Sequence, residues 1–377
     1  MAKIEQRFGK SVFSLIWLGC ALLGAMKTAP AQTVSEIVLH NFGRPTTGGL
    51  PYAGVIRDAA GNLYGTTASG GAANAGVVYK LDATGRESVL YTFTGGTDGG
   101  NPNAGVIRDA AGNLYGTTYG GASAGVVYKL DTGGNETVLY TFTGGASGAW
   151  PESGVIRDAA GDLYGTTSGG GTANAGMVYK LDAAGLETML YSFTGGADGG
   201  YPYGGVIRDA AGNLYGTTAF GGTANAGVVY KLEPVAGGAG QWLETVLYSF
   251  TGAADGHQPI AGVIRDSVGN LYGTTYVGGT AGFGVVYKLD TAGQETVLYS
   301  FTGGPDGGYP YAGVIRDAAG NLYGTTYYYG TAGFGVVYKL DTAGLETVLY
   351  NFKGAPDGGY PYAGVILDRQ PLRDYLP

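Results

Sequence analysis

The chain has 377 residues, among them 75 Gly, 31 Tyr and one Cys, and only 13% of its residues are charged. Its formal net charge of -8 argues against nucleic acid or an anionic membrane surface as a partner, because both are polyanions. A single Cys excludes a disulfide framework, so stability must come from strand pairing and packing.

The N-terminal segment has the pattern of an export signal. Basic residues come first, an apolar run extends from Ser11 to about Met26, and Ala29-Pro30-Ala31 forms a small-x-small cleavage site. We therefore predict a signal peptide over residues 1–31, cleaved after Ala31, and a secreted or cell-surface protein. No other stretch is long and apolar enough to cross a bilayer, so no span is expected in the mature chain.

The rest of the chain repeats one unit. The stretch GVIRDAAGNLYGTT occupies Gly313–Thr326. Near-copies begin at Gly54, Gly105, Gly154, Gly205 and Gly262, and a shortened copy begins at Gly364. Each copy predicts a hairpin, and GVVYKLD and ETVLYSF-like segments add two more strands. Four short strands at a period of about 50 residues are typical of a β-propeller blade.

The two ends of the repeat region match different parts of this unit. Glu36–Phe42 resembles the fourth strand, and Gly364–Asp368 resembles the first. We therefore expect a monomeric propeller over residues 32–368, of seven-bladed design. Six blades would be complete, and the N-terminal strand would close an incomplete seventh. Residues 369–377 match nothing in the unit. Because Gln370–Pro377 can be encoded so that a shift of one base yields SLYGTTY, this tail is hypothesised to be a frameshift product.

The D-x-x-G-N-L-Y core followed by G-V-V-Y-K-L resembles the GloVer (gloeo/verruco) tandem-repeat extracellular proteins of bacteria. The resemblance covers essentially all of Glu36–Asp368. It implies export, often with a C-terminal surface anchor, and no established activity. More loosely, the D-x-x-G-N-L-[YW] core is similar to the blades of sensor-kinase and NHL-type propellers.

Candidate ligand-binding residues lie in two sets of loops. If the first strand is innermost, the loops between strands two and three share one face of the disc with the loops that connect successive units. Aromatic rings beside carboxylates suit sugar rings, which stack on aromatic side chains and bond to acids. The candidates are Asp98, Asp198, Asp306, Asp357, Tyr201, Tyr309, Tyr360, Trp150, His257, Tyr119, Tyr276 and Tyr327. The alternative is that Asp-Gly forms the turn and Tyr-Pro-Tyr packs between blades.

The Arg-Asp pair that ends each first strand has a structural interpretation. In Arg57-Asp58 and its copies, we expect the Asp to cap the hairpin and the Arg to pair with an acid of its own or a neighbouring blade.

No catalytic residue, metal site or cofactor is predicted. The two histidines, His40 and His257, are isolated, and no phosphate-binding loop occurs. The predicted function is a non-enzymatic exported protein that binds extracellular carbohydrate or a cell-surface protein. Alternatives are a propeller enzyme of lactonase or glycan-cleaving type, for which Asp255 beside His257 is the one asymmetric hint, and a purely structural surface component. Single-loop calcium sites at Gly-Gly-x-Asp-Gly-Gly are a further possibility.

Overall fold

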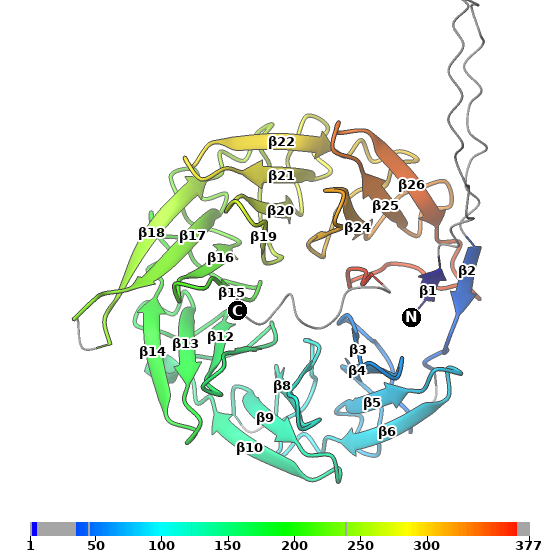
Figure 1. The fold of residues 1–377 in the computed structure, drawn as a ribbon, viewed down its shortest axis with the longest axis vertical. Coiled ribbons are helices and arrows are strands. Elements are labelled where there is room, and N and C mark those ends of the chain that lie inside the picture. The colour runs from blue at the N-terminus through cyan, green and yellow to red at the C-terminus, as the bar shows by residue number, and fades with distance from the viewer. Residues whose placement is uncertain (1, 6–34, 44–45, 122, 238–239, 368–377) are drawn as a thin grey trace, which may run out of the picture.

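The computed structural model describes residues 2–5, 35–43, 46–121, 123–237 and 240–367. These residues form six four-stranded antiparallel sheets and one two-stranded sheet. The four-stranded sheets are arranged as blades around a central axis, with the first strand of each innermost (Figure 1). The predicted all-β propeller of four-stranded blades is confirmed. No helix in the described ranges is long and apolar enough to span a membrane.

Each blade takes its four strands consecutively from the chain. Blade 1 contains β3 (Ile56–Arg57), β4 (Leu63–Thr67), β5 (Val77–Leu81) and β6 (Glu87–Thr92), and blade 2 contains β7 (Ile107–Arg108), β8 (Leu114–Thr118), β9 (Val126–Leu130) and β10 (Glu136–Thr141). Blade 3 contains β11 (Ile156–Arg157), β12 (Leu163–Thr167), β13 (Met177–Leu181) and β14 (Glu187–Ser192), and blade 4 contains β15 (Ile207–Arg208), β16 (Leu214–Thr218), β17 (Val228–Pro234) and β18 (Trp242–Ser249). Blade 5 contains β19 (Ile264–Arg265), β20 (Leu271–Thr275), β21 (Val285–Leu289) and β22 (Glu295–Ser300), and blade 6 contains β23 (Ile315–Arg316), β24 (Leu322–Thr326), β25 (Val336–Leu340) and β26 (Glu346–Asn351). A short 3-10 helix, η1 (Gly145–Ser147), precedes blade 3.

The turn between the first two strands forms as its sequence predicts. Asp58 Oδ1 accepts a hydrogen bond from the Asn62 amide at 2.8 Å, and Tyr64 Oη donates to Asp58 Oδ2 at 3.0 Å. Burial opposes ionisation of this carboxyl, but the bonds from Asn62 and Tyr64 outweigh it and lower the pKa of Asp58. Gly61 has a φ of 85°, a backbone angle that residues with a Cβ rarely adopt. The hairpin cap is therefore confirmed.

A buried tyrosine fills the middle of each blade. Tyr79 of β5 is fully buried, and its ring lies against Gly65 in the facing strand β4. A Cβ at Gly65 would lie 2.5 Å from the Tyr79 hydroxyl. The glycine of each LYGTT strand thus makes room for the tyrosine of the neighbouring VVYKL strand, which explains why the two segments recur together.

The seams between blades hold most of the core. Phe93, the residue after β6, is fully buried, and its ring centroid lies 5.1 Å from that of Tyr128 in blade 2. Edge-to-face contacts of this kind contribute about 0.5–1.5 kcal/mol beyond the area they bury. Thr66 Oγ1 also donates to the backbone carbonyl of Ala104, at 2.8 Å. Each blade is therefore held by apolar and polar contacts to the next.

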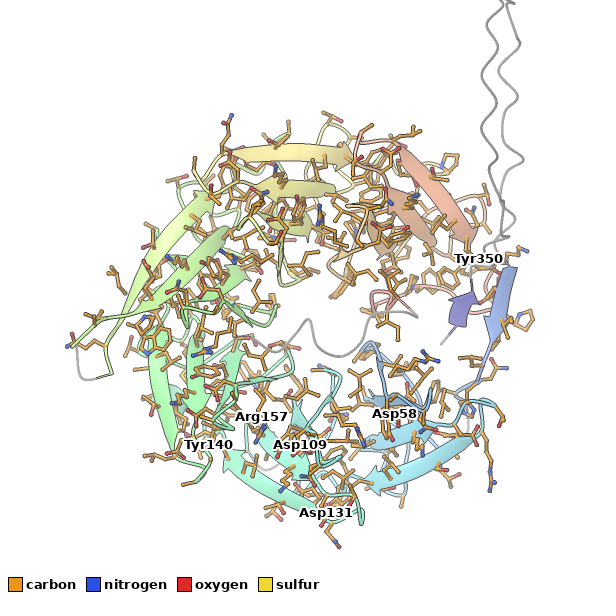
Figure 2. All side chains as sticks on the ribbon, viewed as in Figure 1. Asp58, Asp109, Asp131, Tyr140, Arg157 and Tyr350 are labelled. Carbon is orange, nitrogen blue, oxygen red and sulfur yellow. The ribbon has the colours of Figure 1, made fainter. Side chains whose placement is uncertain are left out.

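The strand-one arginines also belong to the seams. The Arg108 guanidinium lies 5.7 Å from the ring centroid of Tyr64 in the preceding blade, and Arg157 lies 5.5 Å from the ring of Tyr115. The charge of Arg157 is also one of the smaller effects that lower the pKa of Asp109, an acid of that preceding blade. Figure 2 shows Asp58, Asp109 and Arg157 among the blades of this part of the ring. These arginines thus make a cation–π contact across the seam that the sequence did not suggest, and the ion pair with an acid stays a prediction.

The described residues do not form the predicted seventh blade. The described residues form six blades, and the strand expected at Gly364–Asp368 does not form over Gly364–Leu367, while Asp368 lies outside the described residues. The N-terminal strand β2 (Ser35–Val38) pairs instead with β1 (Ala2–Glu5). The physical reason is that a first strand is only two residues long and pairs only with the second strand of its blade. No second strand follows Gly364 in the described chain.

Side-chain contacts nevertheless join blade 6, the N-terminal segment and blade 1. Tyr350 Oη donates to Glu36 Oε2 at 2.6 Å, and the Phe42 ring centroid lies 4.8 Å from that of Tyr79. Figure 2 shows Tyr350 at this junction, beside β2. The predicted signal peptide, apart from β1, and the predicted tail 369–377 lie outside the described residues.

Candidate ligand-binding face

The two loop sets expected on one face do lie together. Backbone bridges join the loop that connects successive blades to the loop between strands two and three. The pairs are Gly49 with Ser69, Gly100 with Gly120, Ala149 with Gly169, Gly200 with Phe220, His257 with Val277 and Gly308 with Tyr328. The candidate residues therefore share one surface, called the loop face below.

The predicted Asp residues of the connecting loop hold its turn. Asp98 Oδ2 accepts hydrogen bonds from the Thr94 amide at 2.8 Å and from Tyr91 Oη at 3.1 Å, while Thr94 Oγ1 donates to Asp98 Oδ1 at 2.5 Å. Burial disfavours the charge, but these bonds outweigh it and lower the pKa of Asp98. Asp198, Asp306 and Asp357 occupy the equivalent turns. The structure gives these four carboxylates the turn role that was the alternative.

Asp255 is not the asymmetric feature that an enzyme interpretation would use. Its carboxylate accepts from Tyr248 Oη at 3.0 Å and from the Thr251 amide at 2.7 Å, which are the bonds of the other copies. His257 is half-buried, and its backbone pairs with that of Val277. Two connecting loops have no Asp in this place. The loop before blade 1 has Thr47, and the loop before blade 3 has Ser147, whose hydroxyl lies 2.8 Å from Thr143 Oγ1.

A carboxyl of the next blade lies close to each of these turns. Burial raises the pKa of Glu136, at the start of β10, to about 7, and the charge of Asp98 adds to this effect. Burial followed by the neighbouring aspartate has the same effect on Glu244, Glu295 and Glu346, each with a pKa of about 7. These glutamates are called the seam carboxyls.

One residue in each connecting loop has a left-handed backbone. These display residues are Leu50, Asn101, Trp150, Tyr201, Gln258, Tyr309 and Tyr360, and their φ values lie between 54° and 59°. A left-handed φ is uncommon for residues other than Gly and costs about 1–2 kcal/mol. Such backbone persists only where the surroundings impose it, and it occurs here in every copy.

Two backbone hydrogen bonds impose this conformation. The Tyr201 amide donates to the Ala175 carbonyl in the preceding blade at 2.7 Å, and the Tyr201 carbonyl accepts from the Ala219 amide in its own blade at 3.1 Å. Neither bond involves the Tyr201 side chain. The Pro that follows the display residue also packs tightly, because a Cβ at Gly176 would lie 2.5 Å from Pro202 Cδ. The loop therefore fixes the backbone and leaves the side chain free to vary.

Five of the seven side chains at these positions are exposed, and those of Gln258 and Tyr309 are half-buried. Leu50 is 52% exposed, Trp150 44%, Tyr360 41% and Tyr201 40%. Large apolar side chains are usually covered in a soluble protein, so several of them at equivalent positions on one face indicate a contact surface.

The structure brings most of the predicted aromatic candidates together in pairs. Tyr119 stacks on Trp150 with ring centroids 6.5 Å apart and planes 26° apart. Tyr276 lies 5.2 Å from Tyr309, and Tyr327 lies 5.5 Å from Tyr360. Tyr201 pairs instead with Phe220, at 5.8 Å, which lies in the loop between strands two and three of its own blade. In each pair one ring comes from a display residue and the other from the loop of the preceding or same blade.

A second row of residues lies two positions after the display residues. These mouth residues are Tyr52, Asn103, Glu152, Tyr203, Ile260, Tyr311 and Tyr362. Three of them form a continuous aromatic contact, because the Tyr362 ring centroid lies 4.7 Å from those of both Tyr52 and Tyr311. Tyr327 Oη also lies 3.2 Å from Tyr362 Oη. Tyrosines thus gather over blades 5 and 6 and reach across the junction to blade 1.

The sequence analysis missed Glu152, whereas Tyr311 and Tyr362 were expected on the same face as the candidates. The signal for Glu152 was present, since it stands at the third position of the Tyr-Pro-Tyr register of the connecting loop. The sequence did not show that the last residue of this register can contact its equivalents in other blades, as Tyr362 contacts Tyr52 and Tyr311. In the described part of the chain, no three His, Cys, Asp or Glu residues are placed to hold a metal ion.

Solved structures show that this fold is shared with other proteins. A candidate 6-phosphogluconolactonase from Bacteroides uniformis is 16% identical over 85% of this chain and 88% of its own, with a TM-score of 0.53. A luciferin-regenerating enzyme is 15% identical over 74% of this chain and 84% of its own, with a TM-score of 0.45. At these identities the likeness concerns the fold alone. A search of curated proteins found no match to this sequence.

The repeat itself matches a family model. The model for the Gloeobacter/Verrucomicrobia repeat matches residues 24–209 and 183–372. Together these two matches span most of the sequence, including all six blades. The chain therefore belongs to the Gloeobacter/Verrucomicrobia repeat family.

Proposed function

We propose that this propeller is a non-enzymatic module that binds extracellular saccharide through its loop face. The observation that supports the proposal most strongly is the set of display residues, which hold exposed aromatic rings in a fixed left-handed backbone. Flat aromatic rings stack against the apolar faces of sugar rings, and a preformed backbone reduces the entropy lost on binding. Export and a monomeric state are part of this proposal, because an extracellular ligand requires both a secreted protein and an uncovered face.

Variation between copies supports the same proposal. The strands are nearly the same from blade to blade, as in the LYGTT strand of all six blades, whereas the display residue is Leu, Asn, Trp, Tyr or Gln. A purely structural repeat gains nothing from differences at an exposed, strained position. A ligand that is itself asymmetric, such as an oligosaccharide, requires different side chains around the ring.

A glycan array probed with the purified protein would test the proposal, followed by calorimetry with each oligosaccharide that binds. We expect Trp150→Ala and Tyr201→Ala each to weaken binding by about tenfold or more, because each removes an exposed stacking surface. Leu186→Ala is the matched control. Leu186 is 67% exposed, but it lies in the turn between β13 and β14, outside the two loop sets.

Three results would argue against the proposal. An empty array together with capture of a cell-surface protein on the same face would favour protein recognition. Hydrolysis of a lactone or glycoside panel would favour the enzyme alternative, which shares its fold with the candidate 6-phosphogluconolactonase. Loss of binding in Leu186→Ala would place the contact on the opposite loops.

A further inference from the structure

One mouth residue carries a charge. Glu152 leads into blade 3, and the other six mouth residues, all of them described, are uncharged Tyr, Asn or Ile side chains. Glu152 is half-buried, and its Oε2 accepts a hydrogen bond from Asn103 Nδ2 of the neighbouring mouth position at 3.2 Å. The carboxylate thus breaks the symmetry of a ring that is otherwise uncharged.

The charge of Glu152 reaches tyrosines of other blades. Burial raises the pKa of Tyr203, which leads into blade 4, and the charge of Glu152 is the next cause. Burial and the neighbouring phenols raise the pKa of Tyr311, and Glu152 again contributes. Tyr311 leads into blade 6, and the blades that contain β12 and β24 lie on opposite sides of the ring (Figure 1). Glu152 therefore belongs to the same row of mouth residues as Tyr203 and Tyr311, and its charge acts on both phenols.

No cation in the described ranges balances this carboxylate. The ion pairs formed there by Lys and His side chains involve Glu87, Asp162 and Glu233, and no basic side chain is among the influences on Glu152. Burial raises the pKa of Glu152, and the bond from Asn103 opposes that rise only in part. A carboxylate that has lost part of its water without gaining a counter-charge gains most from a cationic ligand.

The surroundings favour a cation as well. The faces of tyrosine rings carry negative potential and attract ammonium groups. The whole chain has a net charge of -8, so the long-range field adds to this attraction.

We propose that Glu152 and the mouth tyrosines bind a protonated primary amine of the saccharide, so that the preferred ligands are amino sugars whose amino groups are free. This inference rests on the proposed function: the display residues stack against the sugar rings, and Glu152 recognises the ammonium group. An N-acetylated sugar has the same ring but no charge, and it would leave Glu152 without a counter-ion.

The test compares two β-1,4-linked tetrasaccharides, one of glucosamine and one of N-acetylglucosamine, by calorimetry with the full chain at pH 6. We expect the free amine to bind about tenfold more tightly. Glu152→Gln retains an oxygen that can accept the Asn103 bond but removes the charge. It should abolish the preference, so that the two sugars bind with the same affinity.

Two further variants make the result decisive. Glu233→Gln removes the same charge from the outer part of blade 4, where Glu233 pairs with Lys231, and it should retain the preference. Glu152→Tyr installs the residue that other copies carry, and it should also abolish the preference. It replaces Glu152→Gln in the test if that variant does not fold. Equal binding of both sugars by the unmodified protein overturns the amine inference and leaves saccharide binding intact. Absence of binding to either sugar and to the whole array overturns the proposed function itself.

Discussion

The seams between blades and the loop face are built from the same repeated unit, yet they differ in what they fix. At a seam the side chains are fixed: the Phe93 ring packs on Tyr128, and the same pair recurs as Phe193 on Tyr230. On the loop face the backbone is fixed and the side chain varies, as at Trp150 and Tyr201. Substitutions at a seam should therefore change stability, and substitutions at display positions should change binding.

The largest effect is expected from pH, because it acts on several seams at once. The seam carboxyls have a pKa near 7 in the folded protein, above the unfolded value of about 4.3. Their stabilisation is complete below the unfolded pKa and is lost as pH rises through the folded pKa, so stability should fall between about pH 4.5 and pH 7.5.

The hairpin carboxyls have the opposite sign. The pKa of Asp58 and of Asp109 is lowered, so their contribution is present above the unfolded value and is lost as the solution is acidified below about pH 4. Thermal unfolding followed by circular dichroism from pH 3 to pH 8 should therefore show a maximum near pH 4.5–5. A melting temperature that rises steadily to pH 8 would contradict this account of the seams.

The next largest effect on stability is expected at the Asp that holds the turn of a connecting loop. Asp198→Ala removes the acceptor of Tyr191 Oη and of the Thr194 amide, and it should cost about 1–3 kcal/mol of unfolding free energy. Asp198→Ser should cost less, because Ser147 fills this place naturally in another loop. Denaturant unfolding measures both variants. Saccharide affinity of the folded Asp198→Ala variant should remain within about twofold, and a larger loss would move this carboxylate back into the binding site.

The smallest stability effect is expected at a display residue, with the opposite sign. Tyr201→Gly places at φ 59° the residue that tolerates a left-handed backbone best, and it should stabilise the fold by up to about 1 kcal/mol. The same change removes an exposed ring and should weaken saccharide binding. Destabilisation by more than about 1 kcal/mol would show that the Tyr201 ring, through its contact with Phe220, is needed for folding.

The sequence specified the blade well because each strand repeats in register. The turn at Asp58, the buried strand around Tyr79 and the shared loop face all followed from local chemistry and from the period. The seam contact of Arg108 over Tyr64 did not follow, because it joins two blades and leaves no mark within one unit.

The seventh blade and the site show where a repeat pattern misleads. The residues at Gly364 match a first strand, but a strand also requires a partner, and none follows in the described chain. At the site, Asp98 stood out because it is the polar residue of a Gly-rich loop, and its polarity is used inside the turn. Glu152 was overlooked because Asn103 and Ile260 also depart from Tyr at this position, and the sequence does not show that the charge of Glu152 acts on a tyrosine of another blade.

The two backbone bonds at each display position have an evolutionary consequence. Because the Tyr201 amide and carbonyl are bonded without regard to the side chain, a point mutation there changes the surface offered to a ligand and leaves the scaffold as it was. Near-identical copies in one gene can also exchange segments by recombination, which would move a display residue from one blade to another in a single event. Selection can therefore change the proposed saccharide-binding surface of this chain one blade at a time.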